Sequence, residues 1–199
     1  MPLSHGFHAV ADGDLALVVT HLEMLSPPSA ANRPEPEGLT VDRVLEPDPA
    51  ANRALYRRIG TDWLWFSRLR QDDAALLATL RDPAYEVYEL RRDGGAIGLL
   101  ELDLRNLPDV EIVFFGLVPE AIGGGGGRFL MTRALALAWR AGVGRVWLHT
   151  CTADHPGALS FYRRSGFVAY RREIEITRDP RLDGTMDEAA ASHMPLIGS

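Results

Sequence analysis

The stretch AIGGGGGRFL, residues 121–130, places five consecutive glycines between an apolar segment and an amphipathic one. The preceding segment, VEIVFFGLV (110–118), is rich in β-branched and aromatic residues, which predicts a strand. After the glycines, apolar residues recur at helical spacing up to Ala141, and Gly142 is a natural cap for that helix. A glycine turn between a strand and a helix N-terminus exposes backbone N–H groups in the field of the helix dipole. The stretch therefore predicts a site for an anion.

Three other interpretations of the glycines fit less well. A P-loop ends in Gly-Lys-Ser/Thr, whereas this loop ends Gly127-Arg128-Phe129, and the chain contains no lysine. A dinucleotide fingerprint that starts at Gly123 would need glycine where Arg128 stands, and the later starting positions fail in the same way. A flexible linker is disfavoured because a strand enters the run and a helix follows it within a few residues.

The rest of the chain alternates between strand and helix patterns. Strands are expected at 15–25, 39–47, 84–92, 96–104, 110–118, 145–151 and 167–176. Helices are expected from 49 to about 70, with an interruption at Gly60, within 71–82, after the glycines and within 155–166. The proline-rich segment 26–38 between the first two strands is expected to be a loop. This order, β-β-α-α-β-β-β-α-β-α-β, includes an antiparallel meander over 84–118 and predicts an α+β fold.

Two segments carry a family resemblance. FFGLVPEAIGGGGGRFLMTRAL (114–135) resembles the acyl-coenzyme A binding segment of the GNAT N-acetyltransferase superfamily, whose pattern is Gln/Arg-x-x-Gly-x-Gly/Ala between a strand and a helix. Alignment on Leu130 puts the two glycines of the pattern on Gly125 and Gly127, and its Gln/Arg position on Ile122, which is a departure. HPGALSFYRRSGF (155–167) is similar to the family's Asn-x-x-Ala-x-x-x-Tyr-x-x-x-Gly-Phe segment, with His155 at the Asn position.

The resemblance covers residues 84–176 and implies the GNAT acyl-coenzyme A N-acyltransferase fold. This is a three-layer α+β fold with a mixed, mostly antiparallel central sheet flanked by helices. It implies an enzyme that transfers an acetyl group from acetyl-coenzyme A to a primary amine of a small molecule or peptide, by direct attack in a ternary complex. The coenzyme-binding residues that it implies are the backbone of Leu117 and Val118, the loop residues Ile122, Gly123, Gly125, Gly126, Gly127 and Arg128, and His155 and Ala158. Within the loop, only Gly125 and Gly127 are expected to require glycine; Gly123, Gly124 and Gly126 are expected to be permissive.

The resemblance also implies two catalytic residues. Tyr162 falls on the family's tyrosine that hydrogen-bonds the thioester sulfur and can protonate the departing thiolate. Glu111 lies near the family's position for a base that removes a proton from the ammonium form of the acceptor. The alternatives are a core aromatic for Tyr162 and a solvated carboxylate for Glu111.

Candidate acceptor-binding residues are less specific. Glu101 and Asp103 project from one face of their strand and could hold an ammonium group, or could belong to a solvated sheet face. Trp63 belongs to an aromatic cluster with Tyr56, Trp65 and Phe66 that could line an acceptor pocket or simply pack in the core.

The length predicts a single domain over 1–177, in which 13–82 shapes the acceptor site and 84–176 forms the coenzyme-binding core. Residues 178–199 show no clear period and are expected to be a loosely held tail. The last strand, 167–176, could pair across a homodimer if it lies at a sheet edge.

Composition limits the partners and the compartment. The net charge of −6 disfavours a nucleic-acid partner and favours a cationic one. Cys151 is the only cysteine, which excludes an internal disulfide and suits a reducing compartment. The N-terminus lacks the pattern of a secretory signal, and no apolar run is long enough for a membrane span, so we expect a cytoplasmic protein without a membrane partner. The six histidines show no metal-ligand spacing, so no metal is expected.

Two rival functions remain open on the sequence. A thiol enzyme would use Cys151 with His149 or His155, although residues two apart on a strand do not guarantee a hydrogen bond. A non-catalytic acyl-coenzyme A sensor or interaction module would keep the fold without turnover. The departures at Ile122 and His155 leave room for this second alternative.

Overall fold

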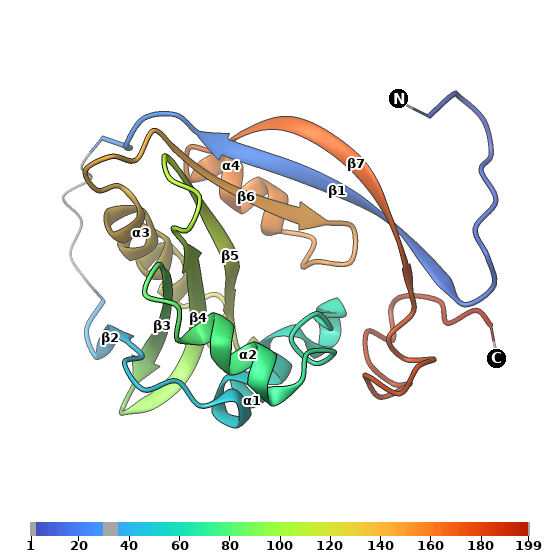
Figure 1. Cartoon of the computed structure of the whole chain (residues 1–199), viewed down its shortest axis with the longest axis horizontal. Helices are drawn as coiled ribbons and strands as arrows, with labels where there is room; N and C mark the ends of the chain where they lie inside the picture. The colour runs from blue at the N-terminus through green and yellow to red at the C-terminus, as the bar shows by residue number, and fades with distance from the viewer. Residues whose placement is uncertain (1–2, 30–35, 199) are drawn as a thin grey trace.

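A seven-stranded sheet in the order β2-β3-β4-β5-β6-β1-β7 runs through the protein (Figure 1). The computed structural model describes residues 3–29 and 36–198, so residues 30–35 of the predicted proline-rich loop lie outside the described residues. The strands are β1 (Asp14–Met24), β2 (Leu39–Arg43), β3 (Tyr85–Arg92), β4 (Gly95–Asp103), β5 (Asp109–Leu117), β6 (Arg145–Cys151) and β7 (Val168–Arg178). The helices are α1 (Pro49–Gly60), α2 (Asp73–Leu80), α3 (Gly126–Ala138) and α4 (Ala158–Arg164), with short 3-10 turns η1 (Thr61–Trp63) and η2 (Pro119–Ala121).

The predicted element order and fold class are confirmed. Five of the six strand pairings are antiparallel, and only β5 and β6, which α3 connects, run parallel. The helical stripe expected from 49 to about 70 is interrupted at Gly60, where α1 ends, and only the 3-10 turn η1 follows it. The predicted end of α3 is wrong: α3 ends at Ala138 with Trp139 as its cap, before Gly142, which has a φ of +89° in the following turn. β7 lies at the edge of the sheet, as its possible role in dimerisation requires.

Helices cover the two faces of the sheet (Figure 1). One core cluster packs α3 and Tyr162 of α4 against the sheet, around Leu100, Val110 and Leu130. A second cluster packs α1 and α2 against the other face, around Tyr56 and Leu99. The start of each of α1 and α2 is fixed by an aspartate cap, Asp48 and Asp72 respectively. The result is a three-layer arrangement in which both helix layers contact β4 and β5.

The C-terminal segment 178–198 is packed, so the expectation of a loosely held tail is wrong. Asp179 and Arg181 are almost fully buried and pair with each other, and Arg181 also donates to the carbonyls of Ala190, Met194 and Pro195. Met186, Ala190 and Ala191 are buried in a third cluster with Leu17, Leu64 and Ala153. Buried polar pairs and apolar contacts therefore hold this segment in place, although its sequence shows no helix or strand period.

Candidate active site

The site begins where β5 and β6 separate. The two strands pair only from Asp109–Arg145 to Glu111–Trp147, and then diverge. A cavity of about 270 Å³ opens beyond that point. Its lining combines β5 and β6 with the segment after α1, the start of α4 and β7.

The end of β5 presents a free backbone edge to this opening. The Val118 N–H donates to the Ile97 carbonyl at 2.9 Å, so the backbone of Val118 bonds toward β4. Because backbone groups alternate in direction along an antiparallel pair, the N–H and C=O of Leu117 point the other way, toward the gap. The backbone of Leu117 is therefore directed at the gap, whereas the Val118 N–H is already used within the sheet.

The glycine loop leads from this edge into α3. Gly123 and Gly125 have positive φ angles of +94° and +83°, and Gly125 is the residue that caps α3. A side chain at Gly127 would meet only ordinary contacts, such as Leu117 Cδ1 at 3.7 Å. The backbone requirement for glycine thus falls on Gly123 and Gly125, and the expectation that Gly123 is permissive is wrong.

The amides of this loop are available. In the described part of the chain, no backbone N–H from Gly123 to Arg128 donates a hydrogen bond to a protein acceptor. Gly126 is buried at the start of the helix, Gly123, Gly124 and Gly125 are exposed, and the Ile122 side chain lines the cavity. The loop therefore has the exposed donors that an anion needs.

Two arginines supply positive charge near the loop. A Cβ placed on Gly124 would lie 3.8 Å from Nη2 of Arg92, so the end of β3 brings this guanidinium beside the glycines. Within residues 3–29 and 36–198, the side chains of Arg92 and Arg128 have no hydrogen-bond or ion-pair partner. Sequence reasoning missed Arg92, because only strand pairing brings it near a loop some thirty residues later in the chain.

Tyr162 reaches the same cavity from α4. Its ring packs against Phe115, Phe161 and Phe167, and no described residue makes a hydrogen bond to its hydroxyl. Burial raises the pKa of Tyr162, and the negative charge of Asp154 raises it further. The phenol is therefore protonated at neutral pH and can donate a hydrogen bond into the cavity.

Glu111 pairs with His149 at the junction of the two strands. Nδ1 of His149 lies 3.6 Å from Oε1 of Glu111. His149 lines the cavity, whereas Glu111 stands behind it on β5. The Glu111 carboxylate raises the pKa of His149 against the opposing effect of burial, and Asp154 and Glu175 add to the rise. Sequence reasoning assigned proton removal to Glu111 alone and considered His149 only beside Cys151.

Asp154 lines the cavity and is a carboxylate that sequence reasoning missed. Its Oδ1 accepts from Trp65 Nε1 at 3.2 Å, and its Oδ2 accepts from Thr150 Oγ1 at 2.6 Å and from the Cys151 N–H at 2.8 Å. The turn after β6 thus holds the carboxylate in one orientation. No motif marks this residue, because Trp65, the partner that joins it to the rest of the cavity, lies 89 residues earlier in the chain.

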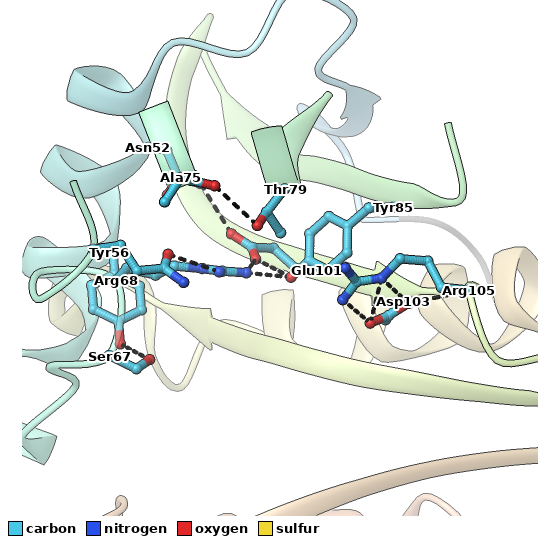
Figure 2. Close-up of polar contacts among 11 residues, drawn as sticks. Asn52, Tyr56, Ser67, Arg68, Ala75, Thr79, Tyr85, Glu101, Asp103 and Arg105 are labelled. Carbon is cyan, nitrogen blue, oxygen red and sulfur yellow. Dashed lines mark hydrogen bonds and ion pairs between the residues drawn. The ribbon is translucent and has the colours of Figure 1, made fainter. Parts of the chain in front are cut away.

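The predicted acceptor carboxylates lie elsewhere. Figure 2 shows Glu101 between Arg68 and Tyr85, and Asp103 against Arg105. Glu101 is completely buried, and its remaining oxygen accepts from Asn52 Nδ2 at 3.0 Å. Neither carboxylate lines the cavity, so the expectation that they hold an incoming ammonium group is wrong: internal partners already satisfy both.

Trp63 and His155 line the cavity side by side. Their ring centroids are 5.0 Å apart, and the ring of His193 from the C-terminal segment lies 5.7 Å from Trp63. Nδ1 of His155 accepts from the Gly157 N–H at 2.9 Å, which fixes the turn before α4 and places Ala158 on the lining. Trp63 thus lines the cavity, and its contact with an acceptor stays a prediction.

Cys151 also lines the cavity, but its environment disfavours a nucleophilic thiolate. Burial raises the pKa of Cys151 to about 11, with a further contribution from the nearby Asp154 carboxylate. A thiol with this pKa is almost entirely protonated at neutral pH, so the thiol-enzyme alternative has no support here.

Two further structural features concern metals and membranes. Among the described residues, no group of three or more His, Cys, Asp or Glu side chains is arranged to hold a metal ion. None of the helices in the described ranges has the length and apolar character needed to cross a membrane.

Comparison with known proteins identifies relatives by sequence and by structure. Residues 49–167 match the sequence profile described as "Acetyltransferase (GNAT) family". No curated protein matches the chain.

Solved structures share the fold at low identity. A GCN5-related N-acetyltransferase from Kribbella flavida has 19% identity and a TM-score of 0.55, over 86% of this chain and 63% of that one. A second such protein, from Sphaerobacter thermophilus, has 20% identity and a TM-score of 0.58, over 83% of this chain and 51% of its own. This chain thus spans less than two thirds of either protein.

An aminoglycoside acetyltransferase from an uncultured soil metagenomic sample, solved with sisomicin, is similar over 69% of this chain and 93% of its own, at 18% identity and a TM-score of 0.57. At such identities these likenesses establish the fold and not the substrate.

Proposed function

Because this chain belongs to the GNAT acetyltransferase family, we propose that it transfers an acetyl group from acetyl-coenzyme A to a primary amine of a small molecule or peptide, by direct attack in a ternary complex. The observation that carries the proposal is the gap where β5 and β6 separate, because a chemically different group lies at each end of that gap. An anion-binding loop lies at the α3 end, and the His149–Glu111 pair lies where the strands part.

The coenzyme would be held by the loop and the free strand edge. The available N–H groups from Gly123 to Arg128 suit the pyrophosphate, and Arg92 adds the positive charge that Ile122 does not supply. The backbone of Leu117 suits the amide-rich pantetheine arm, and His155 and Ala158 border the same cleft. When bound, acetyl-coenzyme A supplies the activated acetyl group and a thiol leaving group.

Proton transfer is assigned to the His149–Glu111 pair. An alkyl ammonium has a pKa of about 10.4, so it must lose a proton before its nitrogen can attack. Neutral His149 would accept that proton, directly or through water, while Glu111 orients the ring and stabilises the resulting imidazolium. Glu111 thereby keeps a role in the base, but as the partner of the group that faces the cavity.

Tyr162 is assigned to the leaving group. As the amine nitrogen bonds to the carbonyl carbon, the carbon–sulfur bond breaks and negative charge develops on sulfur. The protonated phenol of Tyr162 would donate a hydrogen bond to that sulfur. Burial disfavours the phenolate form of Tyr162. We therefore assign Tyr162 to stabilise the thiolate through a hydrogen bond, and not to transfer its proton completely to sulfur.

Two measurements test the proposal. Isothermal titration with acetyl-coenzyme A measures binding, and a thiol-release assay against a panel of primary amines measures transfer. Binding with amine-dependent thiol release supports the proposal. Binding without thiol release for any amine would instead support the non-catalytic acyl-coenzyme A module.

A further inference from the structure

The cavity contains carboxylates without cationic partners. Four carboxylates are buried in the described structure: Glu86, Glu101, Asp103 and Asp179. Each of these four pairs with an arginine. In contrast, Asp154 and Glu175, which line the cavity, have no ion-pair partner within the described ranges. The three hydrogen bonds that Asp154 accepts come from neutral donors, so within these ranges the negative charge of both carboxylates is left unmatched by a cation.

The lining has no arginine, and the chain has no lysine. The cavity's other titratable groups are His149, His155, Cys151, and the hydroxyls of Tyr56 and Tyr162. A protonated His149 would already be matched by Glu111. A carboxylate or phosphate on the acceptor would therefore face Asp154 and Glu175 without a fixed cation to hold it.

Asp154 is joined to an aromatic wall. Trp65, which donates to Asp154, packs against Tyr56 and Phe114 with centroid distances of 5.2 and 5.3 Å. Trp63, Phe66 and Leu17 extend this apolar wall around the cavity. The carboxylate and the aromatic surface are thus held as one unit. This combination suits a ligand with a cationic amine on an apolar body.

We propose that the acceptor is a primary amine carried on an aromatic or similarly apolar body, without an acidic group. This inference rests on the proposed function and narrows its substrate class. Asp154 and Glu175 attract the ammonium form, and the tryptophan wall holds the apolar body. The amine then loses its proton to His149 and attacks the acetyl carbonyl. Amino acids are disfavoured by their carboxylate, and polycationic sugars by the apolar wall.

The test compares matched amines on the wild-type protein with saturating acetyl-coenzyme A. Tryptamine and tryptophan share one aromatic body and differ in the carboxylate, while sisomicin and spermidine are polycations without an aromatic body. We expect kcat/KM from thiol release to be about 100-fold higher for tryptamine than for tryptophan, because only tryptophan brings a carboxylate near Asp154 and Glu175. We also expect it to be at least about tenfold higher than for either polycation.

Two variants test the roles of the carboxylates. Glu175→Gln replaces an exposed carboxylate with an amide. Asp154→Asn replaces a half-buried carboxylate with an amide of the same size. Each is expected to raise KM for tryptamine about tenfold with a smaller change in kcat, and to narrow the preference over tryptophan. Unchanged KM in both variants would overturn the assignment.

A binding measurement separates the two proposals. Tryptamine, tryptophan and sisomicin are titrated into the protein saturated with coenzyme A. Thiol release that prefers tryptophan or sisomicin overturns the substrate class and leaves acetyl transfer intact. Selective binding of tryptamine without thiol release from any amine overturns acetyl transfer and supports the ligand class. Neither selective binding nor thiol release overturns both.

Discussion

Nδ1 of His149 lies 3.6 Å from Oε1 of Glu111, across the last paired position of β5 and β6. The two residues come from strands that run parallel and part at this point. The Glu111 carboxylate therefore raises the pKa of His149, which is the member of the pair that lines the cavity.

Glu111→Gln is expected to shift the pH dependence of catalysis. In the wild type, Glu111 raises the pKa of His149 above 6.5, so the neutral base and kcat/KM increase as pH rises through that raised pKa. Without the carboxylate, the pKa of His149 falls and the acid limb of the kcat/KM profile moves to lower pH. Kcat at the optimum also falls, because the ring loses its orienting partner.

His149→Gln serves as the matched control and is expected to remove the acid limb of the kcat/KM profile. If the acid limb of the kcat/KM profile stays at the same pH in Glu111→Gln, the proposed effect of Glu111 on the pKa of His149 is wrong.

The Glu111–His149 pair also makes the stability of the fold depend on pH. By linkage, the pair stabilises the fold fully below about pH 6.5 and loses this contribution as pH rises through the raised pKa of His149.

Tyr162→Phe is expected to lower kcat by about 100-fold while the Kd for acetyl-coenzyme A changes little. The substitution removes only the hydroxyl and keeps the ring contacts with Phe115 and Phe167. Thiol release measures the first quantity and isothermal titration the second. Tyr170→Phe, on the exposed edge strand β7, is the control. Full turnover in Tyr162→Phe would exclude the proposed role.

Arg92→Gln is expected to raise the Kd for acetyl-coenzyme A at least about tenfold, because a charge-assisted contact to phosphate is lost. The salt dependence of binding should weaken as well. Arg91→Gln is the adjacent control: its guanidinium already pairs with Glu89 and donates to the Gly94 carbonyl. Equal losses in the two variants would show that the effect is not specific to the loop.

Gly125→Ala is expected to weaken coenzyme binding and to destabilise the protein by about 1–2 kcal/mol, since the residue has a φ of +83° at the cap of α3. Gly124→Ala is the control, because Gly124 has no positive φ and its added Cβ would meet only Arg92 Nη2 at 3.8 Å. Thermal unfolding and titration with acetyl-coenzyme A measure both effects. Equal sensitivity at the two positions would contradict the loop conformation.

Arg181→Met is expected to lower the free energy of unfolding by about 3–5 kcal/mol, because it leaves the buried Asp179 carboxylate without its partner. The exposed pair Arg171–Glu173 provides the control, and Arg171→Met should cost less than about 1 kcal/mol. Urea denaturation at neutral pH measures both values. Similar stabilities of the two variants would mean that the C-terminal segment contributes little.

The same pair predicts a dependence on acid. Burial alone would raise the pKa of Asp179, but the hydrogen bonds and charge of Arg181 lower it overall. A lowered carboxylate pKa gives stability that is present above the unfolded value of about 3.9 and is lost as pH falls through the folded value. The difference in stability between wild type and Arg181→Met should therefore shrink under acidic conditions.

Local patterns were sufficient for the order of the elements and for the turn that joins β5 to α3. The strand, glycine turn and helix from 110 to 138 follow one another in the chain, so their residues could be read in sequence. The aligned motif likewise led to Tyr162, which lines the cavity. The charge facing the loop was missed, because Arg92 reaches it only through the pairing of β3 with β4 and the packing of α3.

The internal partners of two candidate acceptor residues could not be predicted for a similar reason. The alternation around Glu101 and Asp103 correctly placed both on one strand face, but gave no information on what covers that face. The structure covers Glu101 with Arg68, Tyr85 and Asn52. Asp154 follows a strand without any motif, and its importance depends on Trp65, a contact between residues far apart in the chain.

The sequence by itself determined the order of strands and helices, the family and the glycine turn before α3, because periodicity, capping and backbone conformation depend on neighbouring residues. Only the tertiary structure decided which charges are matched internally and which are left for a ligand. That outcome depends on the separation of β5 from β6 and on the long-range packing of α1, α4 and the C-terminal segment around the resulting cavity.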